Sequence, residues 1–171
     1  MPSHYTSKNF IGRTHESEVL NRIHLEAQSG DASGIFLSGR NGIGKTELLR
    51  QSYYHLFNNQ DHAIPFFYTM KTSLSSIENF SRDYFCSFIV QSLAFLKRDM
   101  KIIDACVYTM EDVMQLANGS AMPWIIDLAK NYKQLQNEND PLNLFLSTIS
   151  LPYTSYLMSG KPVIVMLDDF H

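Results

Sequence analysis

The sequence has little cysteine and no clustered metal ligands. Of its 171 residues only two are cysteine, Cys86 and Cys106, and they stand twenty positions apart, while the six histidines are scattered along the chain. Neither a disulfide framework nor the close ligand spacing of a structural metal site is therefore expected. We expect two reduced, buried thiols and a cytoplasmic protein.

Long apolar runs and an excess of one sign of charge are also lacking. The most apolar run near the end, residues 163–167, is far too short to cross a bilayer, and the polar first ten residues do not resemble a secretory signal. With 14 basic and 17 acidic residues the net charge is −3, which argues against nucleic-acid binding through bulk charge. The one basic concentration, at Lys97, Arg98 and Lys101, fits a solvated helix end. A hydrophobic content of 44% is enough for one domain with a packed core.

Apolar periodicity along the chain predicts alternating helices and strands. We expect helices over 16–28, 45–57 and 77–96, two shorter ones within 101–131 that break at Asn118–Gly119 and Met122–Pro123, and a helical segment over 141–158 interrupted near Pro152. We expect strands over 35–38, 63–70 and 163–167, a polar loop over 134–140 and turns over 29–34 and 159–162. Pro65 suggests an edge position for its strand, and the β-branched run 163–167 is typical of a central parallel strand. This alternation favours an α/β layered fold with a parallel sheet.

A glycine-rich motif follows the first expected strand. Residues Gly39, Arg40, Asn41, Gly42, Ile43, Gly44, Lys45 and Thr46 match GxxxxGK[ST] at every fixed position. The glycines let successive backbone N–H groups point into one concavity, and the helix that starts near Lys45 directs its positive end toward phosphates. Lys45 is expected to reach the β- and γ-phosphates and Thr46 to bind Mg²⁺. The motif therefore predicts a phosphate-binding loop, and the neighbouring Glu47 is counted among its candidate contacts.

Two acidic residues end the last expected strand. Asp168 and Asp169 follow the apolar run, and ligands bind at the carboxyl ends of parallel strands in open α/β sheets. Asp168 is the candidate Mg²⁺ ligand, usually through water. Asp169 is the candidate general base for the attacking water, so Lys45 and Asp169 form the predicted catalytic pair.

Three segments together resemble the AAA+/STAND group of P-loop ATPases. They are the phosphate loop, the ending VIVMLDDFH, which is similar to the Walker B segment of that group, and the run Phe10, Ile11, Gly12 and Arg13, followed by Glu16. In the family the N-terminal segment lies against adenine and ribose, so the resemblance implies base-side contacts from these four residues. It also implies ATP and Mg²⁺ as cofactors and a three-layer P-loop NTPase fold with a parallel sheet.

The resemblance divides the chain into parts. They are an N-terminal segment and helix over 1–30, a phosphate-loop unit over 35–71, a helical region over 72–158 that matches nothing recognisable, and the Walker B strand over 162–171. Such ATPases continue with further strands, and two of them flank the strand before the phosphate loop. We therefore expect this chain to be the N-terminal part of the domain, with the sheet incomplete on its C-terminal side. An isolated chain should be poorly stable, aggregation-prone or inactive.

Several functions remain open at this point. The first is an ATPase whose Mg²⁺-dependent binding and hydrolysis of ATP drives conformational change or assembly in a longer parent protein, through self-association or effector domains. The second is a nucleotide-dependent switch or scaffold that binds ATP with little turnover. A nucleic-acid loader would need a basic surface that the sequence does not show. A small-molecule kinase also uses a phosphate loop, but the paired acids and the N-terminal segment count against it.

Overall fold

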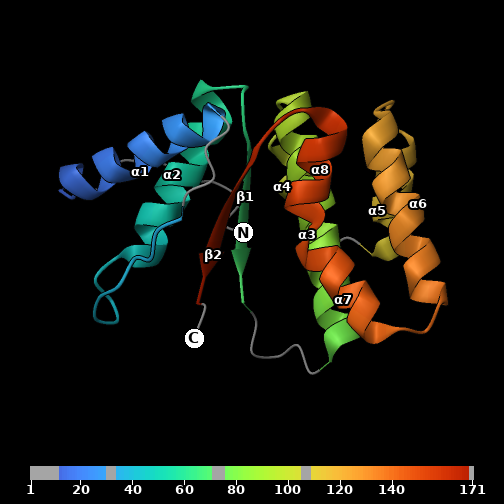
Figure 1. Ribbon diagram of the computed structural model, residues 1–171. Coiled ribbons are helices and arrows are strands. Elements are labelled where there is room, and N and C mark those ends of the chain that lie inside the picture. The colour runs from blue at the N-terminus through green and yellow to red at the C-terminus, as the bar shows by residue number, and fades with distance from the viewer. Residues whose placement is uncertain (1–11, 30–33, 71–75, 105–108, 170–171) are drawn as a thin grey trace.

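The protein is mostly helical, with one small parallel sheet (Figure 1). This computed structural model describes residues 12–29, 34–70, 76–104 and 109–169. Within them the elements follow one another as α1 (Thr14–Gln28), α2 (Lys45–Asn59), β1 (Ile64–Thr69), α3 (Ile77–Lys97), α4 (Lys101–Asp104), α5 (Met110–Asn118), α6 (Pro123–Asn137), α7 (Pro141–Ile149), α8 (Leu151–Ser159) and β2 (Val163–Asp168). The chain thus belongs to a mixed α/β class, as the alternation of helices and strands predicted.

The two strands pair in parallel, in a register that runs from Ile64 opposite Val163 to Thr69 opposite Asp168. Figure 1 shows the sheet between α1 and α2 on one side and the helices α3 to α8 on the other. Both carboxyl ends therefore meet at one edge of the molecule, and the last residue of β2 lies there.

The edge of β1 that faces away from β2 is closed by a side chain. Gln91 of α3, only 4% exposed, accepts a hydrogen bond from the backbone N–H of Phe67 and donates one to its carbonyl oxygen, both at 2.9 Å. Pro65 lies two residues before Phe67, so its missing N–H falls on this same edge. The expectation that Pro65 marks an edge strand is confirmed. Proline is tolerated at this position because this edge of β1 bonds no other strand in the described sheet, so the missing N–H costs no ladder hydrogen bond.

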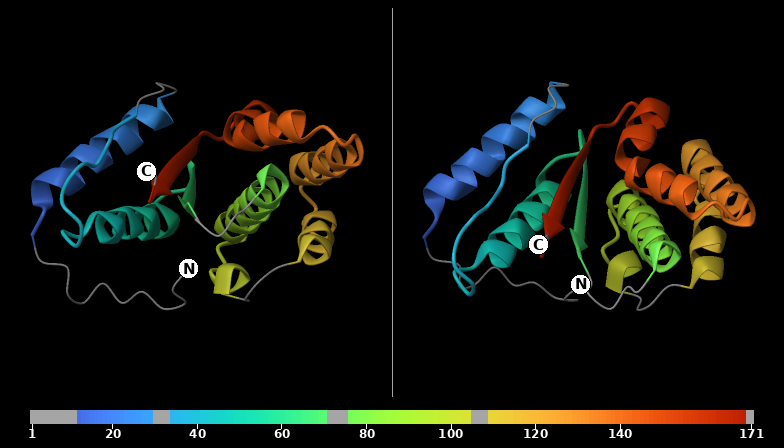
Figure 2. Two further views of the ribbon diagram at one scale, coloured as in Figure 1. Left: turned by 90° about the horizontal axis from the view of Figure 1, so that it is seen from below. Right: turned by 60° about the horizontal axis from the view of Figure 1, so that its bottom comes forward.

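The largest core surrounds α3. The predicted apolar face of this helix is buried from Tyr84 to Leu93, and the ring of Phe88 meets that of Phe66 on β1 with centroids 5.2 Å apart. Phe85, in the same buried face, stacks on Tyr132 of α6 with ring centroids 4.0 Å apart. In its described residues, the region 72–158, for which the sequence showed no resemblance, is built mainly of helices α3 to α8. They pack together on one side of the sheet, with α3 directly against β1 and with α5 and α6 farther out (Figure 2), and we call them the helical layer.

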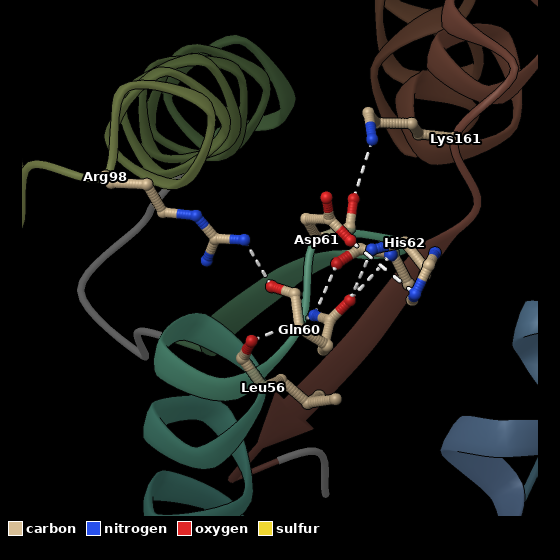
Figure 3. Close-up of polar contacts among 7 residues, drawn as sticks. Leu56, Gln60, Asp61, His62, Arg98 and Lys161 are labelled. Atoms are coloured by element: carbon tan, nitrogen blue, oxygen red, sulfur yellow. Dashed lines mark hydrogen bonds and ion pairs between the residues drawn. The ribbon is translucent and has the colours of Figure 1, made fainter.

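The connection from α2 to β1 is held by three polar side chains (Figure 3). The amide nitrogen of Gln60 donates to the carbonyls of Leu56 and Ala63, at 2.9 and 2.8 Å. Arg98 donates to the carbonyls of Phe57 and Gln60, and Lys161 donates to that of Asp61 at 2.6 Å. Arg98, from the basic concentration that the sequence showed, therefore caps the C-terminal end of α2.

Three expectations about secondary structure are wrong. Residues 35–38 are not a strand: no strand pairs with them within the described residues, and Phe36 is 94% exposed. Residues 134–137 continue α6 rather than forming a loop, because Leu135 still packs against the core. β2 is not central, since β1 is its one neighbour in the described sheet and Val165 and Leu167 are 38% and 40% exposed.

The remaining described elements agree with their predictions except within 101–131, where the structure has three helices, α4, α5 and α6, instead of the expected two. The helices over 16–28 and 45–57 are α1 and α2, α5 ends at Asn118, α6 begins at Pro123, and Pro152 stands in the first turn of α8. Gly160 adopts a left-handed conformation, with φ 72°, in the turn before β2. Most of the expected turn over 29–34 lies outside the described residues.

Candidate functional site

The glycine-rich motif forms an exposed turn that leads directly into α2. Gly44 is the N-cap of the helix and has φ 92°, a left-handed conformation that favours glycine. A Cβ atom at Gly39 would lie 2.5 Å from Cδ1 of Ile43, so a larger residue there would displace that side chain. Within the described residues no side chain caps this helix N-terminus, which leaves its first N–H groups directed at the space beside the loop.

The Lys45 side chain folds back over the start of the loop. Its Nζ donates to the carbonyl oxygens of Gly39 and Arg40, at 2.8 and 3.1 Å. The ammonium is therefore held against the first two residues of the loop. If an anion bound in the loop, Lys45 would exchange these neutral carbonyl partners for charged oxygens. Charged oxygens accept stronger hydrogen bonds from an ammonium.

Two residues 122 positions apart in the sequence meet beside the loop. The Thr46 hydroxyl, in the first turn of α2, donates to a carboxylate oxygen of Asp168 at 2.9 Å. Asp168 is the last residue of β2 and is 7% exposed. This hydrogen bond thus joins the start of α2 to the end of β2.

Asp169 differs from its neighbour in environment. It is exposed and has φ 55°, a left-handed conformation that bends the chain immediately after β2. The turn separates the directions of the two acids, and only Asp168 is buried against α2.

The start of α1 also contacts the loop. Arg13, with φ 58°, is the N-cap of α1 and follows Gly12, with φ 98°. Its guanidinium donates to the carbonyl oxygen of Ile43 and lies 3.7 Å from the carboxylate of Glu16. Arg13 therefore ties the start of α1 to the glycine-rich loop. Phe10 and Ile11 lie outside the described residues.

The residues around Thr46 fit a hydrated magnesium ion. Mg²⁺ is commonly held by one or two protein oxygens and keeps several waters, and the hydroxyl of Thr46 and the carboxylate of Asp168 are two such oxygens. Among the described residues no group of three or more histidine, cysteine or acidic side chains could hold a metal. Glu47, half-buried in the first turn of α2, follows Thr46 directly in the sequence.

Behind the loop, a buried histidine that the sequence did not single out joins α1 to α2. His24 is 5% exposed, and its Nε2 lies 3.2 Å from the hydroxyl oxygen of Ser52. Burial, with a smaller contribution from His55, lowers the pKa of His24 to about 4. The available signal was helical spacing, because His24 stands one turn after the buried Leu20 on the same face of α1.

Comparisons with protein-family models, with curated proteins and with solved structures give no match for this chain. In the described part of the chain no helix has the length and apolar character needed to cross a membrane. The interpretation of the site therefore rests on its residues and their geometry.

Proposed function

We propose that this chain is an ATP-binding P-loop ATPase domain of AAA+/STAND type, in which Mg²⁺-dependent binding and hydrolysis of ATP drive conformational change or assembly in a longer parent protein. The observation that carries the proposal is the hydrogen bond between Thr46 and Asp168. It joins the end of the glycine-rich motif to the first of the two acids, the arrangement that Mg²⁺-nucleotide chemistry needs.

Each residue of the site has a role in this proposal. The backbone N–H groups of 39–46 surround the phosphates and Lys45 neutralises their charge. Thr46 and Asp168 hold the metal, the latter through water. The exposed Asp169 orients and deprotonates the attacking water. Arg13, whose guanidinium donates to the carbonyl oxygen of Ile43, contacts the nucleotide on its base side together with Phe10, Ile11 and Gly12.

The proposed class of protein also implies a fold around this site, a three-layer P-loop NTPase domain with a parallel sheet. The two parallel strands with α2 on one side and α3 on the other are compatible with part of a three-layer P-loop sheet. The exposed apolar run at 35–38, which has no partner strand within the described residues, supports a parent protein that supplies further strands.

A second function has support from the same region. A nucleotide-dependent switch or scaffold would bind ATP with little turnover. Of the two described arginines at the loop, Arg40 is an exposed residue of the motif itself, and the guanidinium of Arg13 is engaged by the carbonyl of Ile43 and by Glu16. Slow single-turnover hydrolysis with tight retention of nucleotide would favour the switch over the ATPase.

The test is calorimetric titration of the chain with Mg²⁺-ATP. Lys45→Ala removes a charge-assisted contact worth about 1.5–3 kcal/mol and should weaken binding about ten- to a hundredfold. The matched control is Lys133→Ala, an exposed lysine on α6, which should bind as the wild type does. If the longer parent protein folds by circular dichroism and binds no nucleotide, the proposal is wrong.

Substitutions of the two acids separate Mg²⁺-dependent binding of ATP from its hydrolysis. Asp168→Asn should abolish the gain in ATP affinity that Mg²⁺ gives, because the metal loses an anionic oxygen. Asp169→Asn should leave binding unchanged and slow hydrolysis, which a phosphate-release assay measures. Equal effects of both substitutions on binding would contradict the assignment of different roles.

A further inference from the structure

Helices α7 and α8 are apolar on two opposite sides. On the inner side Leu144, Thr148, Leu151 and Ser155 are buried, and Phe145 meets Phe80 of α3 with ring centroids 5.6 Å apart. On the outer side six apolar side chains are between 41% and 64% exposed: Leu142, Leu146, Ile149, Tyr153, Tyr156 and Leu157. We call these six residues the outer stripe. A helix that is apolar all round is normally buried all round, so the outer stripe needs a cover.

The outer stripe is continuous across the junction of the two helices. From Leu142 to Tyr156 its members are spaced by four, three, four and three residues, the repeat by which helices pack against each other along a seam. Ser150, between the helices, keeps a right-handed helical conformation, with φ −84° and ψ −2°. Figure 2 shows α7 and α8 following one another along one side of the helical layer.

The size of the outer stripe matches what a pair of proteins buries. Its six side chains expose on the order of 600 Å², so two copies facing each other would cover about 1,200 Å², the lower limit of stable interfaces. An apolar patch of this size is at the upper end of what a monomer exposes.

Charge favours an identical partner in one orientation. No charged residue occurs from Pro141 to Gly160, so two outer stripes meet without like charges between them although each chain carries −3. The acidic residues Glu138 and Asp140 precede the stripe and Lys161 follows it. Antiparallel packing places the acids of each copy beside the lysine of the other, whereas parallel packing places acid beside acid.

We propose that the outer stripe of α7 and α8 is the interface of a two-fold symmetric dimer of this chain, with the helices of the two copies antiparallel. In such a dimer the same patch serves both subunits. The two-fold axis passes near Ile149, the middle of the stripe, and Leu142 of one copy lies near Leu157 of the other. This surface is on the helical layer, away from the phosphate loop, so the two assignments fail or succeed separately.

The first test is the mass of the full chain by sedimentation over a range of concentrations. The wild type should be a dimer, and Tyr153→Lys should raise the dimer Kd about a hundredfold or more, since an ammonium would be buried without a partner. The control Phe36→Lys changes the most exposed apolar side chain among the described residues, in the segment between α1 and α2, and should leave the dimer intact. A monomeric wild type, or dissociation by Phe36→Lys alone, would overturn the proposal.

Cross-linking tests the orientation and does not depend on the lysine variant folding. Ile149→Cys should form a disulfide-linked dimer on oxidation, because the two Cα atoms near the axis come within the ~4.4–6.8 Å that a disulfide allows. Leu142→Cys should not link to itself, since the two copies of residue 142 are about 20 Å apart in the antiparallel arrangement. The unsubstituted chain, which keeps its own two cysteines, gives the background. Self-linking of Leu142→Cys but not of Ile149→Cys would refute the antiparallel arrangement.

Discussion

The helical layer around α3 and the loop at the start of α2 are built in opposite ways. In the layer, rings such as Phe85 and Phe88 are fully buried and meet neighbours from several elements. At the loop, individual polar contacts from Lys45, Thr46 and Arg13 hold the geometry, and Phe36 is 94% exposed. Apolar burial thus stabilises one region, while the other keeps polar groups exposed that a ligand can take over.

The difference shows where stability and binding are expected to respond to substitution. Residues of the layer should change the free energy of unfolding strongly, because their burial is lost when they are truncated. Residues of the loop should change it less, because each has few partners and most of these contacts lie at the surface.

The largest effect is expected for Phe88→Ala. Phe88 is 0% exposed and packs edge-on against Phe66 of β1. Removing the ring leaves a cavity between α3 and the sheet, which should lower the free energy of unfolding by about 3–5 kcal/mol. Urea denaturation followed by circular dichroism measures it. A loss below about 1 kcal/mol would show that the helical layer is loosely packed and that it does not differ from the loop in how it is stabilised.

Gln91→Leu should have the next largest effect. The substitution keeps most of the volume but leaves the buried N–H and carbonyl of Phe67 without the partners that Gln91 supplies. Unsatisfied buried groups cost about 1–3 kcal/mol each, so we expect a loss of about 2–4 kcal/mol in the same assay. Gln134→Leu, at an exposed site on α6, is the control and should change little. Equal effects of the two would mean that the edge of β1 does not need Gln91.

The sequence predicted the two regions to different extents. Helices α1, α2 and α3 and strand β1 follow from apolar spacing, because a buried face repeats along its own element. The strand wrongly predicted at 35–38 comes from the same kind of signal. An apolar run such as Ile35–Leu37 indicates that burial is favourable, but it does not show which element would cover the run. Gln91, which bonds a strand 24 residues away, leaves no periodic signal at all.

At the candidate site the motifs were more informative than the periodicity. The fixed residues of the glycine-rich motif and the acid after the last strand predicted that Thr46 and Asp168 serve one site, and the structure brings their side chains to 2.9 Å. The contact of Arg13 with the loop could not be derived from spacing, since it depends on how α1 returns to the loop. ATP as ligand and hydrolysis as activity stay predictions.

A smaller effect concerns pH and the pairing of α1 with α2. The pKa of His24 is about 4 in the folded chain and about 6.5 when exposed, so between these values the unfolded state binds more protons. The free energy of unfolding should therefore fall as the pH is lowered from about 6.5 to about 4, by at most about 3 kcal/mol through this group. His24→Gln should flatten that part of the profile, whereas His62→Gln, at an exposed position, should not. Identical slopes for the wild type and His24→Gln would mean that His24 takes up its proton without loosening α1.

The smallest effect on stability is expected for Phe36→Ser, although it removes a whole aromatic ring. Because the Phe36 side chain is 94% exposed, the substitution deletes almost no buried area, and the free energy of unfolding should change by less than about 0.5 kcal/mol. The same change should raise solubility, since an exposed ring favours association. Urea denaturation at low and high protein concentration measures both effects. A loss above about 2 kcal/mol would require Phe36 to be buried in the chain in solution, and the loop side would then be stabilised by apolar packing as the helical layer is.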